Sequence, residues 1–321
     1  MQSRHHAIII CTAILVPACH EWPPDHLDLR DHAQAVLVGA GDIAICKSDA
    51  DNATGRLVAD IVRYYQDKRV PVVVFTAGDN AYPIGSRVDF KFCYDSAWGG
   101  RLKSATRPAP GNHEYLTTGA SAYFDYFGEL AGPPGQGYYR YDLAGWDIFA
   151  LNSEVLHRPS SPLAARLYKR ISSEQYAWLE KELEAPTGDC ILAYWHHPRF
   201  NSGSYGDDPA VATLWDRLYA SGAEVIVTGH EHVYERFKPL RPDRSVDENY
   251  GITQFIVGTG GAHLRAFPRG ATFESSAEHM NDRYGVLILA LDHDSVFWRF
   301  VATTGKTEDQ GSVGCHGAPS E

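Results

Sequence analysis

The sequence has no excess of basic residues and no basic cluster. Its 321 residues contain 29 Lys and Arg against 40 Asp and Glu, which gives a formal net charge of −11 at pH 7. Binding to nucleic acid depends on clustered lysine and arginine side chains that neutralise backbone phosphates. We therefore expect no nucleic acid among the partners. A small phosphorylated molecule is not excluded, because bound metal ions can supply local positive charge.

The sequence also lacks a hydrophobic run long enough to cross a membrane as a helix. The apolar run of residues 7–16 follows Arg4 and is too short to span a bilayer, as is typical of a signal peptide. The segment Val16-Pro17-Ala18-Cys19 resembles a bacterial lipobox, in which the cysteine becomes lipidated, although proline is unusual there. The alternative is ordinary secretion with cleavage near Ala18. We expect an extracytoplasmic protein, either secreted, periplasmic or lipid-anchored through Cys19.

Internal repeats and low-complexity segments are absent as well. Hydrophobic residues make up 44% and charged residues 21% of the chain, which is ordinary for a globular protein with a full core. We expect a signal peptide over residues 1–19 and a polar, proline-containing tether over 20–34. A single domain should follow over 35–305, and a polar, loop-like tail over 306–321.

Four cysteines remain once the first 19 residues are set aside. They are Cys46, Cys93, Cys190 and Cys315. Export permits disulfide bonds, and four cysteines allow three pairings. We favour Cys46–Cys93 and Cys190–Cys315, because Cys46 and Cys93 both follow loops that we place at the functional site.

Hydrophobic patterns predict an alternation of buried strands and amphipathic helices. The expected strands cover residues 35–38, 70–75, 104–110, 190–195, 225–228, 252–257, 284–291 and 295–301, with a hairpin over 138–142 and 146–151. One helix should be capped by Asn52, a second should start at a capping box of Ser172 and Gln175, and a third should start at Asp208-Pro209. Residues 85–104 should form a long loop with a short helix.

Side chains that can bind metal ions follow five of the expected strands. The positions are Asp42; Asp79; Asn112 and His113; His196 and His197; and His230 and His232. Each position alone could be an ordinary turn or loop, but the five together indicate a site. Parallel strands would bring all five ends to one edge of a sheet. Carboxylate, amide and imidazole groups gathered there could hold two metal ions about 3.5–4 Å apart, with one carboxylate bridging them, as phosphoester hydrolysis requires.

Five sequence blocks resemble those of the calcineurin-like metallophosphoesterases, and among these the purple acid phosphatases. The blocks are Gly41-Asp42-Ile43-Ala44, Gly78-Asp79-Asn80-Ala81-Tyr82, Gly111-Asn112-His113-Glu114, His196-His197-Pro198, and Gly229-His230-Glu231-His232-Val233-Tyr234-Glu235-Arg236. Their order is that of the family. The resemblance implies a four-layer α/β/β/α sandwich, in which two mixed β-sheets are flanked by helices.

The resemblance also implies a role for each block residue. One metal ion would be held by Asp42, Tyr82 and His232, and a second by Asn112, His196 and His230. Asp79 would bridge the two ions. Within the His196-His197 pair, the ligand position of the family falls on His196.

The ligand Asn112 and its neighbour His113 would also act on the substrate. Asn112 would neutralise charge on the phosphoryl group, and His113 would give a proton to the leaving alkoxide. The alternative for His113 is a structural residue of its loop. Contacts to substrate are expected from His197, Asn201 and Tyr205.

Two differences from the wider family bear on the metal and the substrate. Ala44 stands where most calcineurin-like enzymes have a ligating histidine, while Tyr82 stands where purple acid phosphatases have a ligating tyrosine. A phenolate suits Fe(III) better than a divalent ion, so we expect iron at this site and Zn, Fe(II) or Mn at the other. The alternative for Tyr82 is an aromatic side chain packed in a turn. In addition, residues 199–229 contain no histidine, whereas many purple acid phosphatases have phosphate-binding histidines there.

The activity implied by the resemblance is hydrolysis of phosphate monoesters through attack of a metal-bound hydroxide. A phosphodiesterase or nucleotide-cleaving enzyme on the same site is the main alternative. A non-catalytic surface protein that binds metal or phosphate is a further one.

Overall fold

The computed structural model describes residues 29, 33–271 and 274–319. The expected signal peptide, Cys19 and most of the tether lie outside these residues. The strands are β1 (Ala35–Ala40), β2 (Val72–Ala77), β3 (Thr106–Ala109), β4 (Tyr139–Leu143), β5 (Trp146–Ala150), β6 (Cys190–Tyr194), β7 (Val225–Thr228), β8 (Tyr234–Phe237), β9 (Thr253–Val257), β10 (Ser276–Met280), β11 (Gly285–Leu291), β12 (Ser295–Ala302) and β13 (Thr307–Gly314).

The helices include several short 3-10 segments and one π-helix, η3. They are α1 (Ala50–Asp67), α2 (Arg87–Asp89), η3 (Phe90–Gly99), α3 (Gly100–Leu102), η4 (Lys103–Ala105), η5 (Glu114–Leu116), η6 (Thr118–Ala120), α4 (Ser121–Phe127), η7 (Gly128–Ala131), η8 (Glu154–Leu156), α5 (Pro162–Glu184), η9 (Pro209–Val211) and α6 (Ala212–Ala220). No helix in the described ranges has both the length and the apolar character that crossing a membrane requires.

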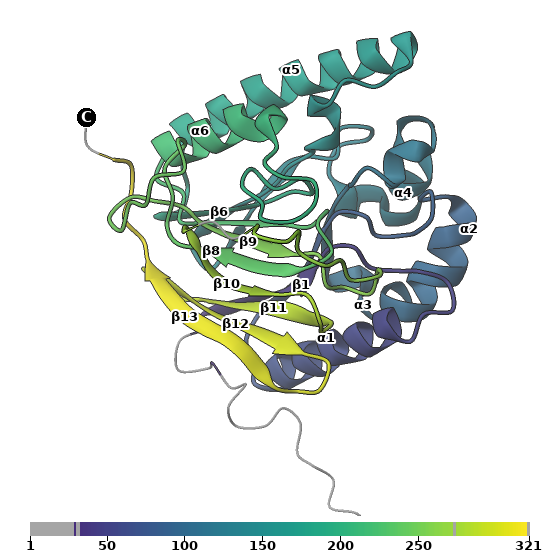
Figure 1. Ribbon diagram of the computed structural model, residues 1–321, viewed down its shortest axis with the longest axis horizontal. Coiled ribbons are helices and arrows are strands. Elements are labelled where there is room, and N and C mark those ends of the chain that lie inside the picture. The colour runs from purple at the N-terminus through teal and green to yellow at the C-terminus, as the bar shows by residue number, and fades with distance from the viewer. Residues whose placement is uncertain (1–28, 30–32, 272–273, 320–321) are drawn as a thin grey trace, which may run out of the picture.

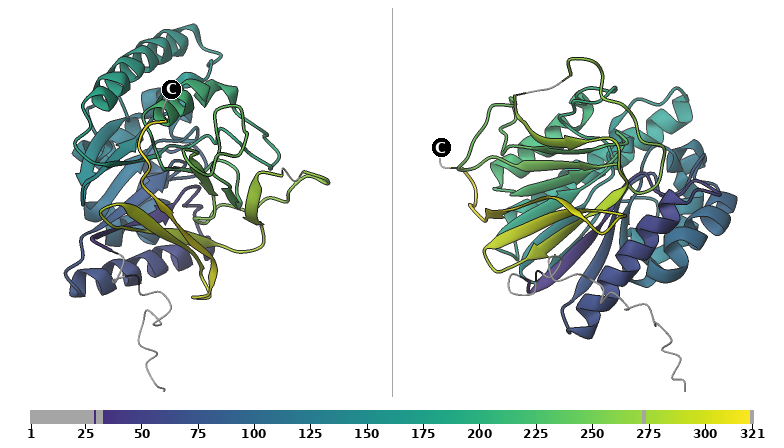
Figure 2. Two further views of the ribbon diagram at one scale, coloured as in Figure 1. Left: turned by 90° about the vertical axis from the view of Figure 1, so that its left-hand side faces the viewer. Right: turned by 60° about the horizontal axis from the view of Figure 1, so that its bottom comes forward.

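Two β-sheets lie between two layers of helices (Figures 1 and 2). The first sheet has the strand order β13-β12-β11-β1-β2-β3, and the second has the order β10-β8-β9-β7-β6-β5-β4. The long helices α5 and α6 cover the outer face of the second sheet, while α1 and the helices after β2 cover the first (Figure 1). The four-layer sandwich of two mixed sheets is therefore confirmed.

Alternation along β6 explains why its run is apolar throughout. Leu192 and Tyr194 face the first sheet, where the Tyr194 ring lies 5.7 Å from that of Phe75 in β2. Ile191 and Ala193 face the opposite way and pack in the cluster that includes the apolar side chains of α5 and α6. A strand covered on both faces needs hydrophobic residues at every position.

The strand ends that carry the candidate ligands belong to two sheets rather than one. β1, β2 and β3 run parallel in the first sheet, and β6 and β7 run parallel in the second. The expectation that all five ends share one sheet edge is wrong in this respect. The carboxyl edges of the two packed sheets meet instead, so the ligands converge from both sides of the sandwich.

Two helix starts differ from those expected. α1 begins at Ala50 with Asp49 at its cap position, and Asn52 lies inside the first turn, where its side-chain amide donates to the Ser48 carbonyl at 2.9 Å. α5 begins at Pro162, because Ser161 accepts a hydrogen bond from Ala164 N and proline is favoured at the first helical position. Ser172 therefore lies in the middle of α5.

The sequence patterns also missed polar and irregular elements. Most of residues 87–105 are helical rather than a loop, and β8, β10 and β13 were not expected. β13 pairs antiparallel with β12 over residues 307–314, so this part of the tail is not a loop. It is an edge strand whose order comes from backbone hydrogen bonds, and its side chains follow no apolar alternation.

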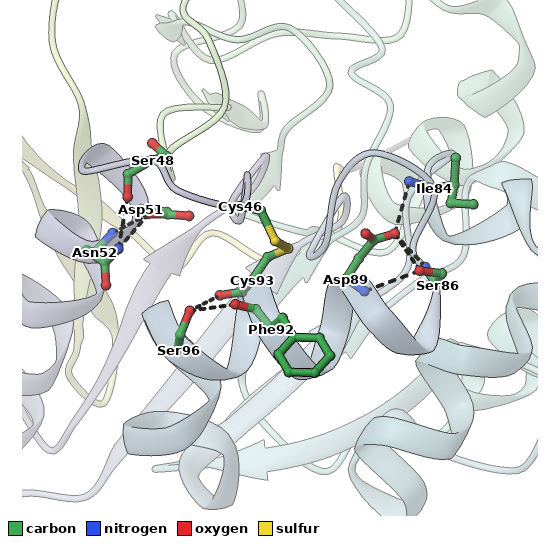
Figure 3. The surroundings of a disulfide bond; sticks show 10 residues. All are labelled: Cys46, Ser48, Asp51, Asn52, Ile84, Ser86, Asp89, Phe92, Cys93 and Ser96. Atoms are coloured by element: carbon green, nitrogen blue, oxygen red, sulfur yellow. Dashed lines mark hydrogen bonds between the residues drawn. A yellow bond between two sulfur atoms is a disulfide. The ribbon is translucent and has the colours of Figure 1, made fainter.

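Both expected disulfide bonds are present. Cys46–Cys93 joins the loop after β1 to η3, and Cys190–Cys315 joins the start of β6 to the segment after β13. Figure 3 shows the first bond beside the 84–89 turn, in which Asp89 accepts hydrogen bonds from the backbone N–H groups of Ile84 and Ser86. Cys46 lies four residues after Asp42, so this bond restrains a loop that carries a candidate ligand.

Removing either disulfide should lower stability, but only one should weaken metal binding. We expect the Cys46→Ser/Cys93→Ser and Cys190→Ser/Cys315→Ser proteins each to lose about 2–5 kcal/mol in the free energy of unfolding, because each bond closes a long loop. Metal affinity should fall only in the first protein, since Cys190 lies at the end of β6 away from His196. Thermal unfolding and calorimetric metal titration of the two double variants check this. Equal metal affinities would contradict the bracing role of Cys46–Cys93.

Candidate metal centre

Three loops of the candidate centre contain a ligand in the left-handed backbone region. Asp42, Asp79 and His230 have φ values of 58°, 50° and 70°. This conformation costs a non-glycine residue roughly 1–2 kcal/mol, and such strain concentrates at functional sites. The geometry turns each side chain back toward the edge where the sheets meet.

Glycines beside the ligands permit the loops to approach closely. A Cβ atom on Gly111 would lie 2.3 Å from Asp79 Oδ1, and one on Gly229 would lie 2.6 Å from Asp42 Oδ2. Any larger residue at either position would collide with a candidate ligand. The glycines of these blocks are therefore required by the packing of the site itself.

One group of donor atoms comes from Asp42, Tyr82 and His232. The Tyr82 hydroxyl lies 2.9 Å from Asp42 Oδ1 and 3.1 Å from His232 Nε2. His232 Nε2 lies 3.2 Å from Asp42 Oδ1. All three side chains are buried, so a carboxylate oxygen, a phenol and an imidazole nitrogen meet away from water.

A second group comes from Asn112, His196 and His230. The side-chain oxygen of Asn112 lies 3.0 Å from His196 Nε2 and 3.0 Å from His230 Nδ1. The two imidazole nitrogens are 3.2 Å apart. Three potential donors thus surround one point.

Asp79 stands between the two groups. Its Oδ2 atom lies 3.0 Å from the Tyr82 hydroxyl and 3.3 Å from His196 Nε2. Its Oδ1 atom accepts a hydrogen bond from the backbone N–H of His113 at 2.8 Å. One carboxylate oxygen therefore touches both donor groups.

Backbone carbonyls orient two of the imidazoles. His196 Nδ1 lies 2.9 Å from the Ala77 carbonyl, and His232 Nδ1 lies 2.7 Å from the His263 carbonyl. Because a carbonyl only accepts, each Nδ1 carries the proton. Each Nε2 then faces the centre, where its lone pair can bind a metal ion once that nitrogen has lost its proton, which is the usual arrangement of metal-binding histidines. The donor set of carboxylates, phenol, amide and imidazoles fits metal ions in two adjacent positions.

The charges of the centre are strongly coupled. Burial alone would raise the pKa of Asp79, but His196 lowers it below its ordinary value. Burial would lower the pKa of His196, but the Asp79 carboxylate raises it to about 10. Burial, reinforced by the positive charge of His196, lowers the pKa of His230 to about 3. Burial and the Asp42 carboxylate raise the pKa of Tyr82. A metal ion must therefore displace protons from His196 and Tyr82.

The family model of the calcineurin-like phosphoesterases matches residues 26–234, which is more than half of the chain. The chain belongs to this family. The matched range contains every residue of the two donor groups and Asp79.

Curated relatives of this phosphoesterase include plant purple acid phosphatases. Purple acid phosphatase 18 of Arabidopsis thaliana is 29% identical over 130 residues, which cover 39% of this chain and 26% of the relative. Purple acid phosphatase 15 of the same plant is 25% identical over 187 residues, which cover 51% and 32%. The chain thus matches only about a third or less of the length of these relatives.

Solved structures share the fold at low sequence identity. Purple acid phosphatase PPD1 from yellow lupin seeds has a TM-score of 0.62 and 18% identity, with 87% of this chain and 53% of that chain covered. GAP50, described as the anchor in the inner membrane complex of Plasmodium, has a TM-score of 0.65 and 13% identity, with coverage of 88% and 89%. At these identities the likeness concerns the fold alone.

Glu114 is a buried residue of the phosphoesterase site to which the sequence analysis gave no role. Its carboxyl oxygens accept hydrogen bonds from the backbone N–H groups of Asn80 at 2.9 Å, Ala81 at 3.2 Å and Gly111 at 2.8 Å. Burial and the nearby Asp79 charge raise its pKa to about 8. Glu114 joins the loop after β2 to the loop after β3, and so sets the distance between Asp79 and Asn112. The position of Glu114 in the Gly-Asn-His-Glu block was the signal in the sequence that could have revealed this role.

The residues expected to contact substrate lie in different environments. His113 is partly exposed, with Nε2 3.8 Å from Asp79 Oδ2, and Tyr205 is 54% exposed with its ring on that of His230. Asn201 is fully buried, donates to Glu231 Oε2 at 3.1 Å and accepts from Gly203 N at 2.7 Å. The expectation that Asn201 contacts substrate is wrong, because both ends of its amide hold the loop together.

His197 belongs to a second cluster that the sequence did not predict. Its Nδ1 lies 2.8 Å from Ser153 Oγ, and its Nε2 lies 3.7 Å from Glu154 Oε2. The ring of His157 lies 4.2 Å from that of His197. The two nitrogens of His157 face the Ser153 carbonyl at 3.0 Å and an Asp208 carboxylate oxygen at 2.7 Å. Burial would lower the pKa of His157, but the Asp208 carboxylate raises it above its ordinary value, which favours the charged imidazolium that two accepting partners require.

Metal binding should release protons, so the apparent affinity should rise with pH. In the metal-free protein the raised pKa of His196 keeps that imidazole protonated at pH 7, while the lowered pKa of His230 keeps that one neutral. Between pH 6 and 8 we expect about a tenfold gain in affinity per pH unit for each proton displaced. Calorimetric zinc titrations in buffers of different ionisation enthalpy count these protons. An affinity independent of pH would contradict the charged state assigned to His196.

Proposed function

We propose that this phosphoesterase is an exported hydrolase of phosphate monoesters that works with two metal ions. The observation that carries the proposal is the position of Asp79 Oδ2, which lies 3.0 Å from the Tyr82 hydroxyl and 3.3 Å from His196 Nε2. A carboxylate shared between two donor groups is suited to bridge two cations. Such a pair of ions is the usual means of stabilising both the attacking and the leaving oxygen in phosphoester cleavage.

In this proposal the two donor groups hold different metals. Asp42, Tyr82 and His232 bind Fe(III), for which a phenolate is a suitable anionic ligand. Asn112, His196 and His230 bind Zn, Fe(II) or Mn. When bound, the ions activate a water molecule and neutralise charge on the phosphoryl oxygens.

His113 is placed to act on the leaving group. Its Nδ1 lies 2.5 Å from the Pro83 carbonyl, so this nitrogen carries a proton and Nε2 is directed toward Asp79. The ring also packs against Tyr82, with 4.3 Å between centroids. In its charged form His113 donates the Nε2 proton to the leaving alkoxide, a step worth about 10²–10⁴-fold in rate.

Export is supported by the two disulfide bonds, because such bonds persist in oxidising compartments. The proposed partner is a small phosphorylated molecule. A lipid anchor at Cys19 remains a prediction from the sequence.

Turnover of p-nitrophenyl phosphate and bis-p-nitrophenyl phosphate by the metal-loaded protein tests the function. We expect kcat/KM to favour the monoester. Asp79→Asn should reduce kcat/KM by more than about 100-fold. Loss of a residue that only supports a ligand costs up to about that much, and Asp79 is itself a proposed ligand. A preference for the diester would assign the site to phosphodiester cleavage. Full metal content without turnover of either ester would favour a binding protein.

His113→Ala separates proton donation from metal binding in the same assay. Alkyl phosphates, whose leaving groups are strong bases, should lose more activity than p-nitrophenyl phosphate, whose leaving group needs no proton. Equal losses for both substrates would remove His113 from this role.

The assignment of iron is tested by colour. A phenolate bound to Fe(III) absorbs visible light, so iron-loaded wild-type protein should be coloured, and Tyr82→Phe should lose this band while it retains the fold. Absorption spectra of the two proteins at equal iron content give the comparison. An unchanged band in Tyr82→Phe would exclude Tyr82 as the ligand.

A further inference from the structure

Arg265 lies in the loop after β9, at the mouth of the metal centre. Its backbone N–H donates to the carbonyl of His232 at 3.1 Å, so the residue is attached to the ligand loop itself. The side chain is partly exposed. Among the residues that the structure describes, no carboxylate forms an ion pair with its guanidinium.

The aromatic ring of Tyr205 supports this guanidinium. The guanidinium carbon of Arg265 lies 4.6 Å from the centre of the Tyr205 ring. The ring of Tyr205 stacks on His230 at 4.4 Å with 23° between the planes. Its backbone N–H donates to the buried Glu231 at 3.0 Å. Arg265, Tyr205 and His230 therefore form a stack that ends on a metal ligand.

The stack changes the role expected for Tyr205. The imidazole of His230 and the guanidinium of Arg265 both lie against the Tyr205 ring, at 4.4 and 4.6 Å from its centre. Its position in the sequence had predicted a contact to substrate. The geometry makes it the platform that positions the cation above it.

A cation beside two metal ligands is unfavourable unless an anion binds there. The charge of Arg265 acts on both His230 and His232, and it would repel metal ions bound by these residues. An anion between the guanidinium and the metals turns this repulsion into attraction. The effect is stronger for a phosphate monoester, which carries two negative charges, than for a diester, which carries one.

We infer that Arg265, positioned by Tyr205, binds a non-bridging oxygen of the substrate phosphate and selects monoesters over diesters. The inference rests on the proposed function and adds the residue that sets its substrate class. Arginine suits this task because its planar guanidinium can give two parallel hydrogen bonds to a phosphate. It would replace the histidines that residues 199–229 lack.

The test compares Arg265→Gln with wild type, both loaded with metal. Calorimetric titration with inorganic phosphate should show affinity reduced roughly 10- to 100-fold, the range expected for loss of a hydrogen bond between charged groups. KM for p-nitrophenyl phosphate should rise by a similar factor, while KM for bis-p-nitrophenyl phosphate should change less than about threefold. Arg265→Lys should retain part of the affinity, and Tyr205→Ala should lose affinity although no charge is removed.

Arg283→Gln is the matched control, since Arg283 pairs with Asp282 and Glu308 away from the centre. It should bind phosphate as wild type does, and metal content should be equal in all proteins. Unchanged phosphate affinity in Arg265→Gln, or equal losses for both esters, would overturn the inference. If wild type hydrolyses neither ester, the proposed function fails, and phosphate calorimetry still decides whether Arg265 binds the anion. Absence of phosphate binding by wild type would also overturn it.

Discussion

The contact between the Asp79 carboxylate and both donor groups is the constraint on which the rest of the site depends. Oδ2 touches Tyr82 on one side and His196 on the other, while Oδ1 is held by the backbone of His113. A carboxylate that is shared in this way must be placed to within a few tenths of an ångström. Asp79 follows β2 of the first sheet and His196 follows β6 of the second, so the packing of the two sheets sets the distance between them.

The surroundings of Asp79 meet this requirement with rigid groups. Glu114 joins the two loops of the first sheet through backbone hydrogen bonds, and Gly111 lets its own loop approach the carboxylate. The left-handed conformation of Asp79 itself is tolerated because these contacts hold it there. The contacts with Glu114 and Gly111 thus hold the strained backbone and the buried carboxylate of Asp79 in place.

The sequence predicted the parts of this arrangement that local patterns encode. Buried strands appear as apolar runs, and the ligands follow them, so β1, β2, β6 and β7 and the residues at their ends could be identified. The disulfide pairing was also correct. Start positions of helices were harder, because Ser161 and Ser172 are chemically equivalent candidates for α5 and only the proline after Ser161 distinguishes them.

The parts that could not be predicted depend on contacts between segments distant in the sequence. β13 is polar and is ordered by pairing with β12, which no side-chain pattern reveals. His157 and Arg265 come from loops without a motif, and only the fold brings them near the ligands. Asn201 looked available to substrate from its place in the loop, yet it is buried and donates to Glu231, which lies between the ligands His230 and His232.

The division of the ligands between two sheets has a consequence for folding. The donors extend from Asp42 to His232, so no short stretch of the chain contains a complete donor group. A metal ion can therefore bind tightly only after the sheets have packed together, and its binding energy stabilises the finished sandwich without stabilising partly folded forms. We therefore expect metal uptake to follow folding, so that a bound metal would distinguish completely folded chains from the others.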